Sequence, residues 1–308
     1  MVMIDKVFFD ITQYCNGECK YCFTNSVKLS QKYNKELTND EIIDVLNDLY
    51  KIGIEKISIG GGEPFLKNIE EIIEKINKEI KVSITSNGTI LSKKFLEQFK
   101  LNKNIKLTIS LDSLSNEKSN LIRKNININK VIENIKEICK EEETRKRLSI
   151  RTTVSQINYK DIYEIIEFCE KNKISNLKIN STNAFGRAKD NRDVILPFED
   201  FMNLLEELVE YCNNNVKSVN VELPVEKYLK GITRKCMCGT SSLYINWNGN
   251  VYPCAFSEGN LLLGNVKTNS IKEIINKISN FSHENDFCIQ CPINRYKDYE
   301  RKTVELVN

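Results

Sequence analysis

The sequence Cys15-Asn16-Gly17-Glu18-Cys19-Lys20-Tyr21-Cys22 places three cysteines at CxxxCxxC spacing, directly after an apolar stretch at 6–12. Three thiolates can bind three irons of a [4Fe–4S] cluster and leave the fourth iron open to a ligand that the protein does not supply. The alternative is a zinc site that lacks one ligand. Structural zinc takes four ligands, and the single histidine, His283, lies too far along the chain to be an obvious fourth. The spacing favours the iron–sulfur cluster.

Beyond this stretch, short apolar segments alternate with segments whose apolar residues recur at helical spacing. Thr38-Asn39-Asp40-Glu41 has the pattern of a capping box at the start of the first helix. Alternation of this kind predicts parallel strands with helices outside them. We predict strands at 6–12, 55–59, 81–85, 105–111, 148–154 and 176–180, each followed by a helix. The fold class is therefore α/β, an open (β/α)6 partial TIM barrel whose functional residues lie at the C-terminal ends of the strands.

The pattern changes in the last third of the chain. Residues 242–247 and 250–254, on either side of Asn248-Gly249, predict a β-hairpin, and a helix follows. This part has little apolar core of its own and carries five cysteines, so a bound metal would supply its cross-links. We expect two domains, a partial barrel at 1–215 and a small hairpin-and-helix iron–sulfur domain at 216–308.

Composition excludes several classes of function. The 308 residues carry 45 basic and 42 acidic side chains, a net charge of +3, without a long basic stripe, so no nucleic acid is expected as a partner. No apolar run approaches the roughly 20 residues of a membrane span, and the N-terminus lacks a signal peptide. We therefore predict a cytoplasmic protein with no membrane contact. Eleven cysteines are many for that compartment, where structural disulfides are rare, and their grouping favours metal binding.

Polar and glycine-rich motifs follow the predicted strands. Gly60-Gly61-Gly62-Glu63-Pro64 follows the second strand, Ser86-Asn87-Gly88 the third, and Ser110 and Asp112 the fourth. Taken singly, a glycine-rich turn is an ordinary connection from strand to helix, and Ser, Asn and Asp are common at caps and turns. Their position after consecutive parallel strands places them at one edge of the sheet, with the three cysteines.

Together, CxxxCxxC with Tyr21 before its last cysteine, GGGEP, SNG and SLD resemble the signature of the radical S-adenosylmethionine superfamily. The resemblance implies S-adenosylmethionine as cofactor and Cys15, Cys19 and Cys22 as ligands of a [4Fe–4S] cluster. The fourth iron would bind the amino and carboxylate groups of the methionine moiety. One electron would cleave the sulfonium and give a 5′-deoxyadenosyl radical, which abstracts hydrogen from a substrate.

The same resemblance implies the cofactor-binding residues. Gly61, Gly62 and Glu63 would hold the methionine amino group. Arg151 would pair with the methionine carboxylate, or would point outward in a salt bridge. The segment Gly186-Arg187-Ala188 would line the adenine pocket. Polar residues after the third and fourth strands would face the methionine carboxylate and the ribose hydroxyls; they are Ser86, Asn87, Ser110 and Asp112.

The C-terminal cysteines resemble the SPASM extension of these enzymes, or its shorter form, Twitch. The pattern implies an auxiliary [4Fe–4S] cluster, the second in the protein, with the ligands Cys236, Cys254, Cys288 and Cys291. Cys238 is then surplus, although it could be the ligand in place of Cys236. A surplus thiol can give hydrogen to a carbon radical, so Cys238 is a candidate hydrogen donor. A zinc ribbon with four cysteines is the structural alternative.

Enzymes with this resemblance mostly modify ribosomally made peptides, by epimerisation, cross-linking or oxidation, and a peptide is the first candidate substrate. The alternatives are a small-molecule dehydrogenase or epimerase, acting on a sugar or aminocyclitol, and a non-enzymatic iron–sulfur or zinc scaffold. The expected electron donor is a flavodoxin or ferredoxin. Only fourteen residues precede Cys15, so we expect no N-terminal recognition domain before it. Either a separate leader-peptide-binding protein or direct binding of the peptide would then be needed.

Overall fold

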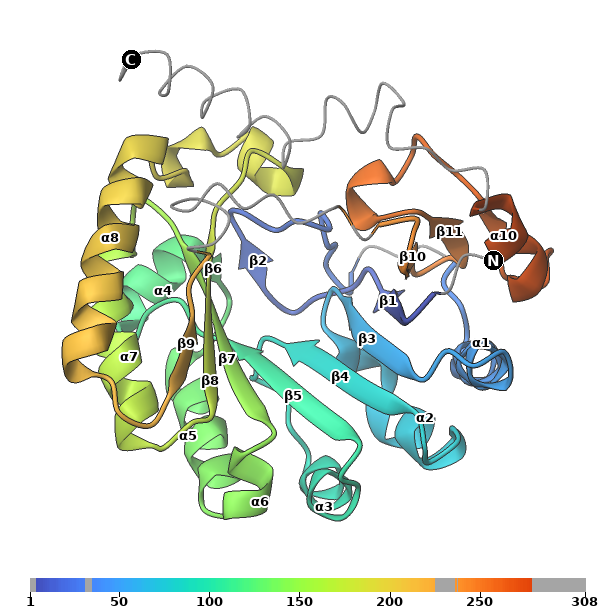
Figure 1. Ribbon diagram of the computed structural model, residues 1–308, viewed down its shortest axis with the longest axis horizontal. Helices are drawn as coiled ribbons and strands as arrows, with labels where there is room; N and C mark the ends of the chain where they lie inside the picture. Colours follow the sequence, from blue (N-terminus) through green and yellow to red (C-terminus); the bar gives the residue numbers. More distant parts are fainter. Residues whose placement is uncertain (1–3, 31–34, 225–235, 237, 279–308) are drawn as a thin grey trace.

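The computed structural model describes residues 4–30, 35–224, 236 and 238–278. Its main sheet has ten strands in the order β12-β11-β10-β1-β3-β4-β5-β7-β8-β9, curved into an open barrel (Figure 1). The strands from β10 through β1 to β9 pair in parallel. The six predicted barrel strands are confirmed; they are β1 (Lys6–Thr12), β3 (Lys56–Gly61), β4 (Lys81–Ser86), β5 (Ile105–Ser110), β7 (Leu148–Val154) and β8 (Asn176–Ser181).

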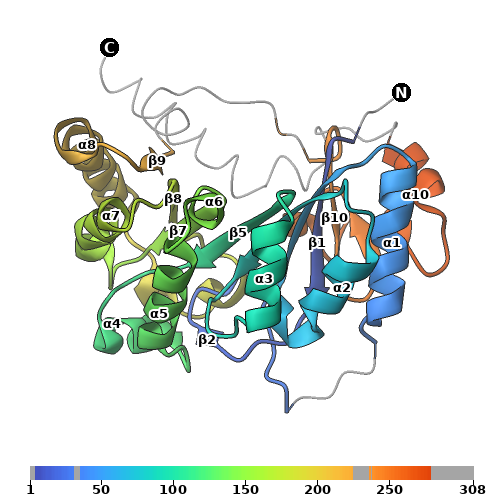
Figure 2. The same cartoon turned by 90° about the horizontal axis from the view of Figure 1, so that it is seen from below.

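Helices cover the convex face of the sheet, and Figure 2 shows α1, α2 and α3 side by side on it. Thr38 caps α1 with the predicted capping box to Glu41. No helix of the described residues is both long and apolar enough to cross a membrane. The helices are α1 (Asn39–Lys51), α2 (Ile69–Lys75), α3 (Lys93–Leu101), α4 (Asn116–Ile122), α5 (Ile128–Cys139), α6 (Glu142–Arg145), α7 (Ile162–Lys171), α8 (Phe198–Asn215) and α10 (Ile271–Ile278). Short 3-10 helices are η1 (Pro64–Lys67), η2 (Tyr159–Asp161), η3 (Gly186–Lys189), η4 (Arg192–Val194) and η5 (Ala255–Ser257).

The two faces of the sheet differ in chemistry. On each barrel strand, alternate residues such as Ile84 and Ile109 are fully buried against the helices. Burying one such side chain stabilises the fold by about 1.5–3 kcal/mol. The residues between them face the concave side and are mostly polar, for example Ser83, Thr85 and Thr108. The concave side is therefore not filled by an apolar core, and it leaves room for a ligand.

The C-terminal segments extend the same sheet at both edges. The predicted hairpin is confirmed as β10 (Ser242–Ile245) and β11 (Asn250–Tyr252), followed by the short β12 (Gly264–Asn265). β10 pairs in parallel with β1, and the Tyr244 hydroxyl donates to the Asp10 carboxylate at 2.8 Å. At the other edge, β9 (Asn220–Glu222) pairs with β8, so the barrel sheet continues past residue 215.

One strand pair had no signal in the sequence. β2 (Glu18–Cys19) lies within the cysteine motif and pairs with β6 (Arg123–Lys124), which follows α4. The two-residue strands are too short for a periodic pattern. Their pairing attaches the cysteine loop to the connection after β5 and brings Arg123 beside Cys19.

Candidate functional site

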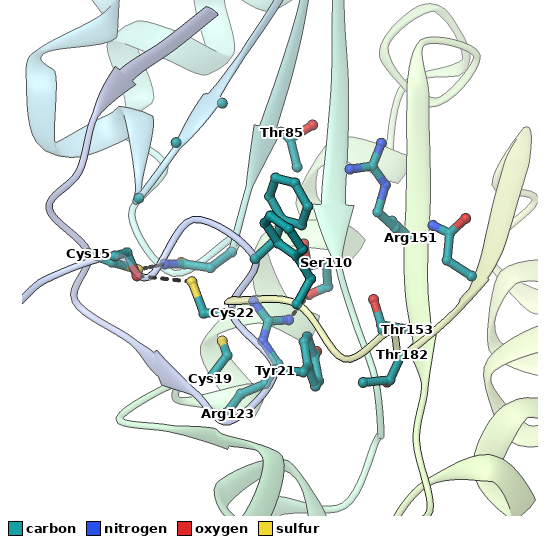
Figure 3. Close-up of a pocket in the computed structure, with 18 of the residues that line it drawn as sticks. Cys15, Cys19, Tyr21, Cys22, Thr85, Ser110, Arg123, Arg151, Thr153 and Thr182 are labelled. Carbon is teal, nitrogen blue, oxygen red and sulfur yellow. Dashed lines mark hydrogen bonds between the residues drawn. The ribbon is translucent and has the colours of Figure 1, made fainter. Parts of the chain in front are cut away.

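A cavity of about 330 Å³ lies at the C-terminal ends of the barrel strands. It collects residues from the cysteine loop, from the ends of β3, β4, β5, β7 and β8, and from the C-terminal part (Figure 3). This is the edge of the sheet at which the sequence predicted the site. Its predicted lining residues are Cys15, Cys19, Cys22, Gly61, Gly62, Ser86, Asn87, Ser110 and Arg151.

The three thiols of the cysteine loop have different surroundings. The Cys15 sulfur accepts a hydrogen bond from the Gly17 N–H at 3.3 Å, while burial raises the pKa of Cys15 to about 11. Burial also raises the pKa of Cys19. Burial opposes ionisation of Cys22 as well, but the positive charge of Arg187 and hydrogen bonds from Ser26 and Thr24 lower its pKa overall. Three thiols lining one cavity, with hydrogen-bond donors to their sulfurs, fit a cluster held by thiolates.

Arg187 holds the cysteine loop in place. Its guanidinium donates to the Cys19 carbonyl at 2.8 Å and to the Ser26 carbonyl at 2.8 Å, and its backbone N–H donates to the Cys22 carbonyl at 2.9 Å. Gly186 packs against the same backbone, since a Cβ on Gly186 would lie 2.1 Å from the Cys22 carbonyl oxygen. The segment expected at the adenine pocket therefore lies against the cysteine loop, and Arg187 is absent from the cavity lining.

The glycines of GGGEP permit a close backbone contact with the start of the cysteine loop. Gly61 has φ of +116°, and a Cβ there would lie 2.2 Å from the Thr12 carbonyl oxygen. A Cβ on Gly62 would lie 2.0 Å from the Tyr14 carbonyl oxygen. The Gly62 N–H donates to the Thr12 carbonyl at 2.7 Å. Only glycine fits both positions, and the result is a backbone wall of the cavity beside the three cysteines.

The side chain of Glu63 does not face the cavity, although the resemblance implied that it would hold the methionine amino group there. Its side chain is fully buried and does not line the cavity. The carboxylate accepts hydrogen bonds from the Ser86 hydroxyl at 2.9 Å, the Asn87 N–H at 2.7 Å and the Phe65 N–H at 3.2 Å. Burial raises the pKa of Glu63 to about 7, although these hydrogen bonds oppose the shift. In this structure Glu63 joins the ends of β3 and β4.

The polar residues after β4 and β5 divide into two groups. Asn87 and Ser110 line the cavity, and the Asn87 amide nitrogen lies 3.9 Å from the Cys15 sulfur. Ser86 lines it too, although its hydroxyl is used by Glu63. Asp112 is buried behind the cavity wall, where it accepts hydrogen bonds from the Tyr21 hydroxyl and from the Thr153 N–H. Burial raises the pKa of Asp112, against the effect of the neighbouring Arg123.

Arg123 is a cavity residue that sequence reasoning missed. Its guanidinium is buried, donates to the Ser110 carbonyl and lies 3.5 Å from Asp112. Burial favours a lower pKa, but the charges of Cys19, Asp112 and Tyr21 raise the pKa of Arg123 above its usual range. Its Nε is buried without a hydrogen-bond partner among the described residues. A buried cation with an unused donor beside the cysteine loop is suited to a carboxylate ligand.

Arg151 points into the cavity from the middle of β7 (Figure 3). Its Nε is buried, and no hydrogen bond or ion pair within the described ranges involves its side chain. Burial lowers the pKa of Arg151, while the more distant Glu222 acts in the opposite direction. The outward salt bridge considered from the sequence does not form with any described residue.

Three aromatic rings close one side of the cavity. Phe23 comes from the cysteine loop, Phe185 from the loop after β8, and Phe256 from η5. Their ring centroids lie 4.8–4.9 Å apart, and all three line the cavity. Contacts of this kind add to the stability that burial provides. The cluster connects the barrel to the C-terminal segment that begins at Cys254.

The C-terminal cysteines are only partly described. The Cys238 thiol hydrogen-bonds with the thiols of Cys236 and Cys254, and these contacts raise the pKa of Cys238. The hydrogen bond from Cys238 lowers the pKa of Cys254 to about 6. Three of the candidate sulfurs are thus in contact. Cys288 and Cys291, the other predicted ligands, lie outside the described residues.

Two family models match the chain. One, described as the radical SAM superfamily, matches residues 9–169, which is more than half of the chain. The other, described as the SPASM iron–sulfur cluster-binding domain, matches residues 236–292. The chain belongs to the radical SAM superfamily. It is an enzyme with a C-terminal SPASM domain, and its cofactors are S-adenosylmethionine and iron–sulfur clusters.

Curated relatives include enzymes of two kinds. A probable GTP 3′,8-cyclase from Methanocaldococcus jannaschii is 33% identical over 239 residues, 76% of this chain and 70% of the relative. The subtilosin biosynthesis protein AlbA from Bacillus subtilis is 28% identical over 279 residues, 87% of this chain and 58% of AlbA. Molybdenum cofactor biosynthesis protein 1 of Dictyostelium discoideum is 32% identical over 51% of this chain, which spans only 25% of that protein.

Solved structures share the fold. SuiB from Streptococcus suis, bound to its precursor peptide SuiA, superposes with a TM-score of 0.72 and 20% identity, over 96% of this chain and 71% of SuiB. anSMEcpe with bound S-adenosylmethionine superposes with a TM-score of 0.67 and 19% identity, over 92% of this chain and 82% of anSMEcpe. At these identities the likeness establishes the fold, including the open barrel predicted from the sequence.

The buried position of Glu63 predicts a structural role that can be measured. Glu63→Ala leaves the Ser86 hydroxyl and two backbone N–H groups without their acceptor, so we expect the free energy of unfolding to fall by about 2–4 kcal/mol. Glu63→Gln keeps an acceptor oxygen and should lose less. Urea unfolding followed by circular dichroism compares the three proteins. Unchanged stability of Glu63→Ala, with weaker S-adenosylmethionine binding, would instead support direct contact with the cofactor.

The contacts of Arg187 predict that it is needed for iron loading. Arg187→Met removes the donors to the Cys19 and Ser26 carbonyls, so the cysteine loop should lose its fixed shape. We expect less iron per protein after anaerobic reconstitution, and Arg187→Lys should not restore it because lysine lacks the planar fork. Arg192→Met, at an exposed arginine five residues away, is the matched control. Full iron content in Arg187→Met would contradict this role.

Proposed function

We propose that this enzyme uses two [4Fe–4S] clusters and S-adenosylmethionine to modify a ribosomally synthesised peptide. Cys15, Cys19 and Cys22 hold the first cluster. The second is held in the auxiliary domain at 216–308, by Cys254, Cys288, Cys291 and Cys236. The fit of the three loop cysteines to one cavity, and the contact between the described C-terminal sulfurs, support this assignment.

When bound, the first cluster and S-adenosylmethionine supply a 5′-deoxyadenosyl radical that abstracts hydrogen from the substrate. The chain's own residues orient the cofactor. The backbone of Gly61 and Gly62 receives the methionine amino group. Arg123, with its unused buried Nε, pairs with the methionine carboxylate beside Ser110. Asp112 holds Arg123 and Tyr21 in place from behind.

The peptide substrate rests on one observation above others. AlbA, named for the biosynthesis of a bacteriocin, aligns with 87% of this chain, including the C-terminal part. The fold shared with SuiB in complex with a precursor peptide agrees with it. A flavodoxin or ferredoxin is the proposed electron donor, and a leader-peptide-binding protein is a proposed partner. The proposed location is the cytoplasm.

A small-molecule substrate is the second candidate. The probable GTP 3′,8-cyclase is 33% identical to this chain over 239 residues, and the match covers 70% of the length of that relative. That relative favours a nucleotide over the sugar or aminocyclitol considered from the sequence. Since its relatives are enzymes, a scaffold without catalytic activity is not supported.

Release of 5′-deoxyadenosine tests the proposed function. Reconstituted protein should hold about eight irons, and Cys15→Ala/Cys19→Ala/Cys22→Ala about four, because one of two four-iron clusters is lost. The triple variant should cleave no S-adenosylmethionine under dithionite, and cleavage at the wild-type rate would refute the site. In the wild type, short peptides encoded near the gene should stimulate release and gain or lose mass. Stimulation by GTP or sugars alone would favour the small-molecule candidate.

Cys238 has two proposed roles that a pair of variants separates. As a hydrogen donor, its S–H bond breaks, a C–H bond forms on the substrate, and the thiyl radical left behind is reduced by one electron from the flavodoxin or ferredoxin and takes up a proton. As a cluster ligand, it replaces Cys236. Its contact with the Cys236 and Cys254 thiols, and its absence from the cavity lining, support the ligand role.

The donor role predicts that Cys238→Ala keeps the auxiliary iron and the release of 5′-deoxyadenosine but loses the epimerised product. The ligand role predicts about four irons instead of about eight in Cys238→Ala, with Cys236→Ala unaffected. Iron content and product stereochemistry are measured on both variants in parallel. Loss of auxiliary iron from Cys238→Ala alone would remove the donor role.

A further inference from the structure

The concave face of the sheet carries an excess of positive charge. On the main-sheet strands β1, β3, β4, β5, β7, β8 and β9, the residues that face the concave side include six bases and two acids, Asp10 and Glu222. Burial raises the pKa of Asp10 to about 7, although the hydrogen bond from Tyr244 opposes the shift, and the charge of the nearby Glu258 also acts on Asp10. The bases are Lys6, Lys56, Lys81, Lys106, Arg151 and Lys178.

Strand register gathers these bases into neighbours. Lys6 is the register partner of Lys56, and Lys56 is the partner of Lys81. On the other side of the barrel, Arg151 is the partner of Lys178. Register partners on adjacent strands lie about 4.8 Å apart and point to the same face.

The curvature of the sheet brings the two groups toward each other. The pKa of Lys6 is lowered first by burial and then by the charges of Lys178, Arg151 and Lys56. Lys6 on β1 therefore lies within electrostatic range of bases on β7 and β8. Figure 1 shows β7 and β8 on the other side of the curved sheet from β1. Like charges held close together, with fewer acids than bases on the same face, favour an anion from outside.

Few contacts within the described ranges neutralise this set. Lys178 pairs with Glu222 at 3.4 Å and Lys81 with Glu55 at 3.1 Å, and the side chains in both pairs are more than a third exposed, so these pairs are weak. Among the residues that the structure describes, Arg151 has no ion pair, and its buried Nε lies inside the cavity without a hydrogen-bond partner. The basic set thus runs from the reaction cavity at Arg151 to the exposed strand starts at Lys56 and Lys106.

We propose that this face binds an acidic segment of the peptide substrate, with Arg151 receiving a carboxylate nearest the target residue and Lys178 and Lys6 receiving the next. The inference rests on the proposed function and names its substrate class. An extended peptide matches charges spread over several strands better than one compact anion, since it rises about 3.3 Å per residue and can reach each base in turn. Arg151 is then a substrate residue, and the methionine carboxylate is left to Arg123.

The probe is a fluorescein-labelled hexaglutamate peptide, followed by fluorescence anisotropy on the reconstituted enzyme with S-adenosylmethionine present. The wild type should bind it at least tenfold more tightly than hexaglutamine. Arg151→Met should weaken hexaglutamate binding more than tenfold, and Lys178→Met more than threefold. Arg151→Lys should bind hexaglutamate nearly as well as the wild type. Lys94→Met, on the outer helix α3, is the control and should change the affinity less than twofold.

A second comparison separates the substrate from the cofactor. Arg151→Met should weaken the binding of hexaglutamate far more than the binding of S-adenosylmethionine. Arg123→Met should weaken the binding of S-adenosylmethionine far more than the binding of hexaglutamate.

Three results would overturn the inference. Equal binding of hexaglutamate by Arg151→Met and Lys94→Met would show that the face is not used. A larger loss of S-adenosylmethionine than of hexaglutamate in Arg151→Met would return Arg151 to the cofactor. Tighter binding of GTP than of hexaglutamate, lost in Arg151→Met, would assign the face to a nucleotide. Failure of the proposed function is separate, because it would appear as no cleavage of S-adenosylmethionine by the wild type, whatever the peptide affinity.

Discussion

The cysteine loop depends on hydrogen bonds from residues distant in the sequence, and the rest of the site depends on the loop. Among residues 13–30 and 35–38, which the structure describes between β1 and α1, the two-residue β2 is the only strand and no helix is present. The loop's carbonyl groups at Cys19, Cys22 and Ser26 find their donor in Arg187, more than 160 residues later. Buried carbonyls need such partners, so Arg187 fixes the backbone from which the thiols project. A loop held in this way is ordered before a cluster binds, which lowers the conformational entropy lost on binding.

The sheet separates stability from function. Parallel sheets are commonly covered on both faces, and their strands then read as continuous apolar runs. Here the strands alternate, with isoleucine, leucine and valine against the helices and serine, threonine, lysine and arginine toward the concave side. The apolar core lies between the sheet and the helices that cover its convex face. Polar residues on the concave side therefore do not disrupt this core. The ends of this open sheet are extended by β10 and β9, and Tyr244 and Asp10 join β10 to β1 at the concave side.

The sequence allowed the strands to be predicted because their alternation is local, and it allowed the cysteine site to be predicted because three ligands fall within eight residues. It did not reveal Arg123, whose role comes from the pairing of β2 with β6 across about 100 residues. The parallel pairing of β10 with β1 was equally hidden, since nothing near Ser242 indicates its partner strand. For Glu63 the sequence identified the residue but not its contacts. The motif containing it was found, but its carboxylate faces Ser86 and backbone groups that only the fold brings together.

The two arginines of the cavity show how surroundings distinguish identical side chains. Arg123 lies among Cys19, Tyr21 and Asp112, and its interactions with these groups raise its pKa and fix its position. In the described part of the chain, Arg151 has no hydrogen-bond or ion-pair partner and lies near other bases, so its charge is left for a ligand. A carboxylate beside Arg123 would be at the cysteine loop, while one beside Arg151 would be at the opposite wall of the same cavity. Two anionic groups can therefore occupy the cavity together without sharing a cation, as a cofactor and a substrate that react with each other must do.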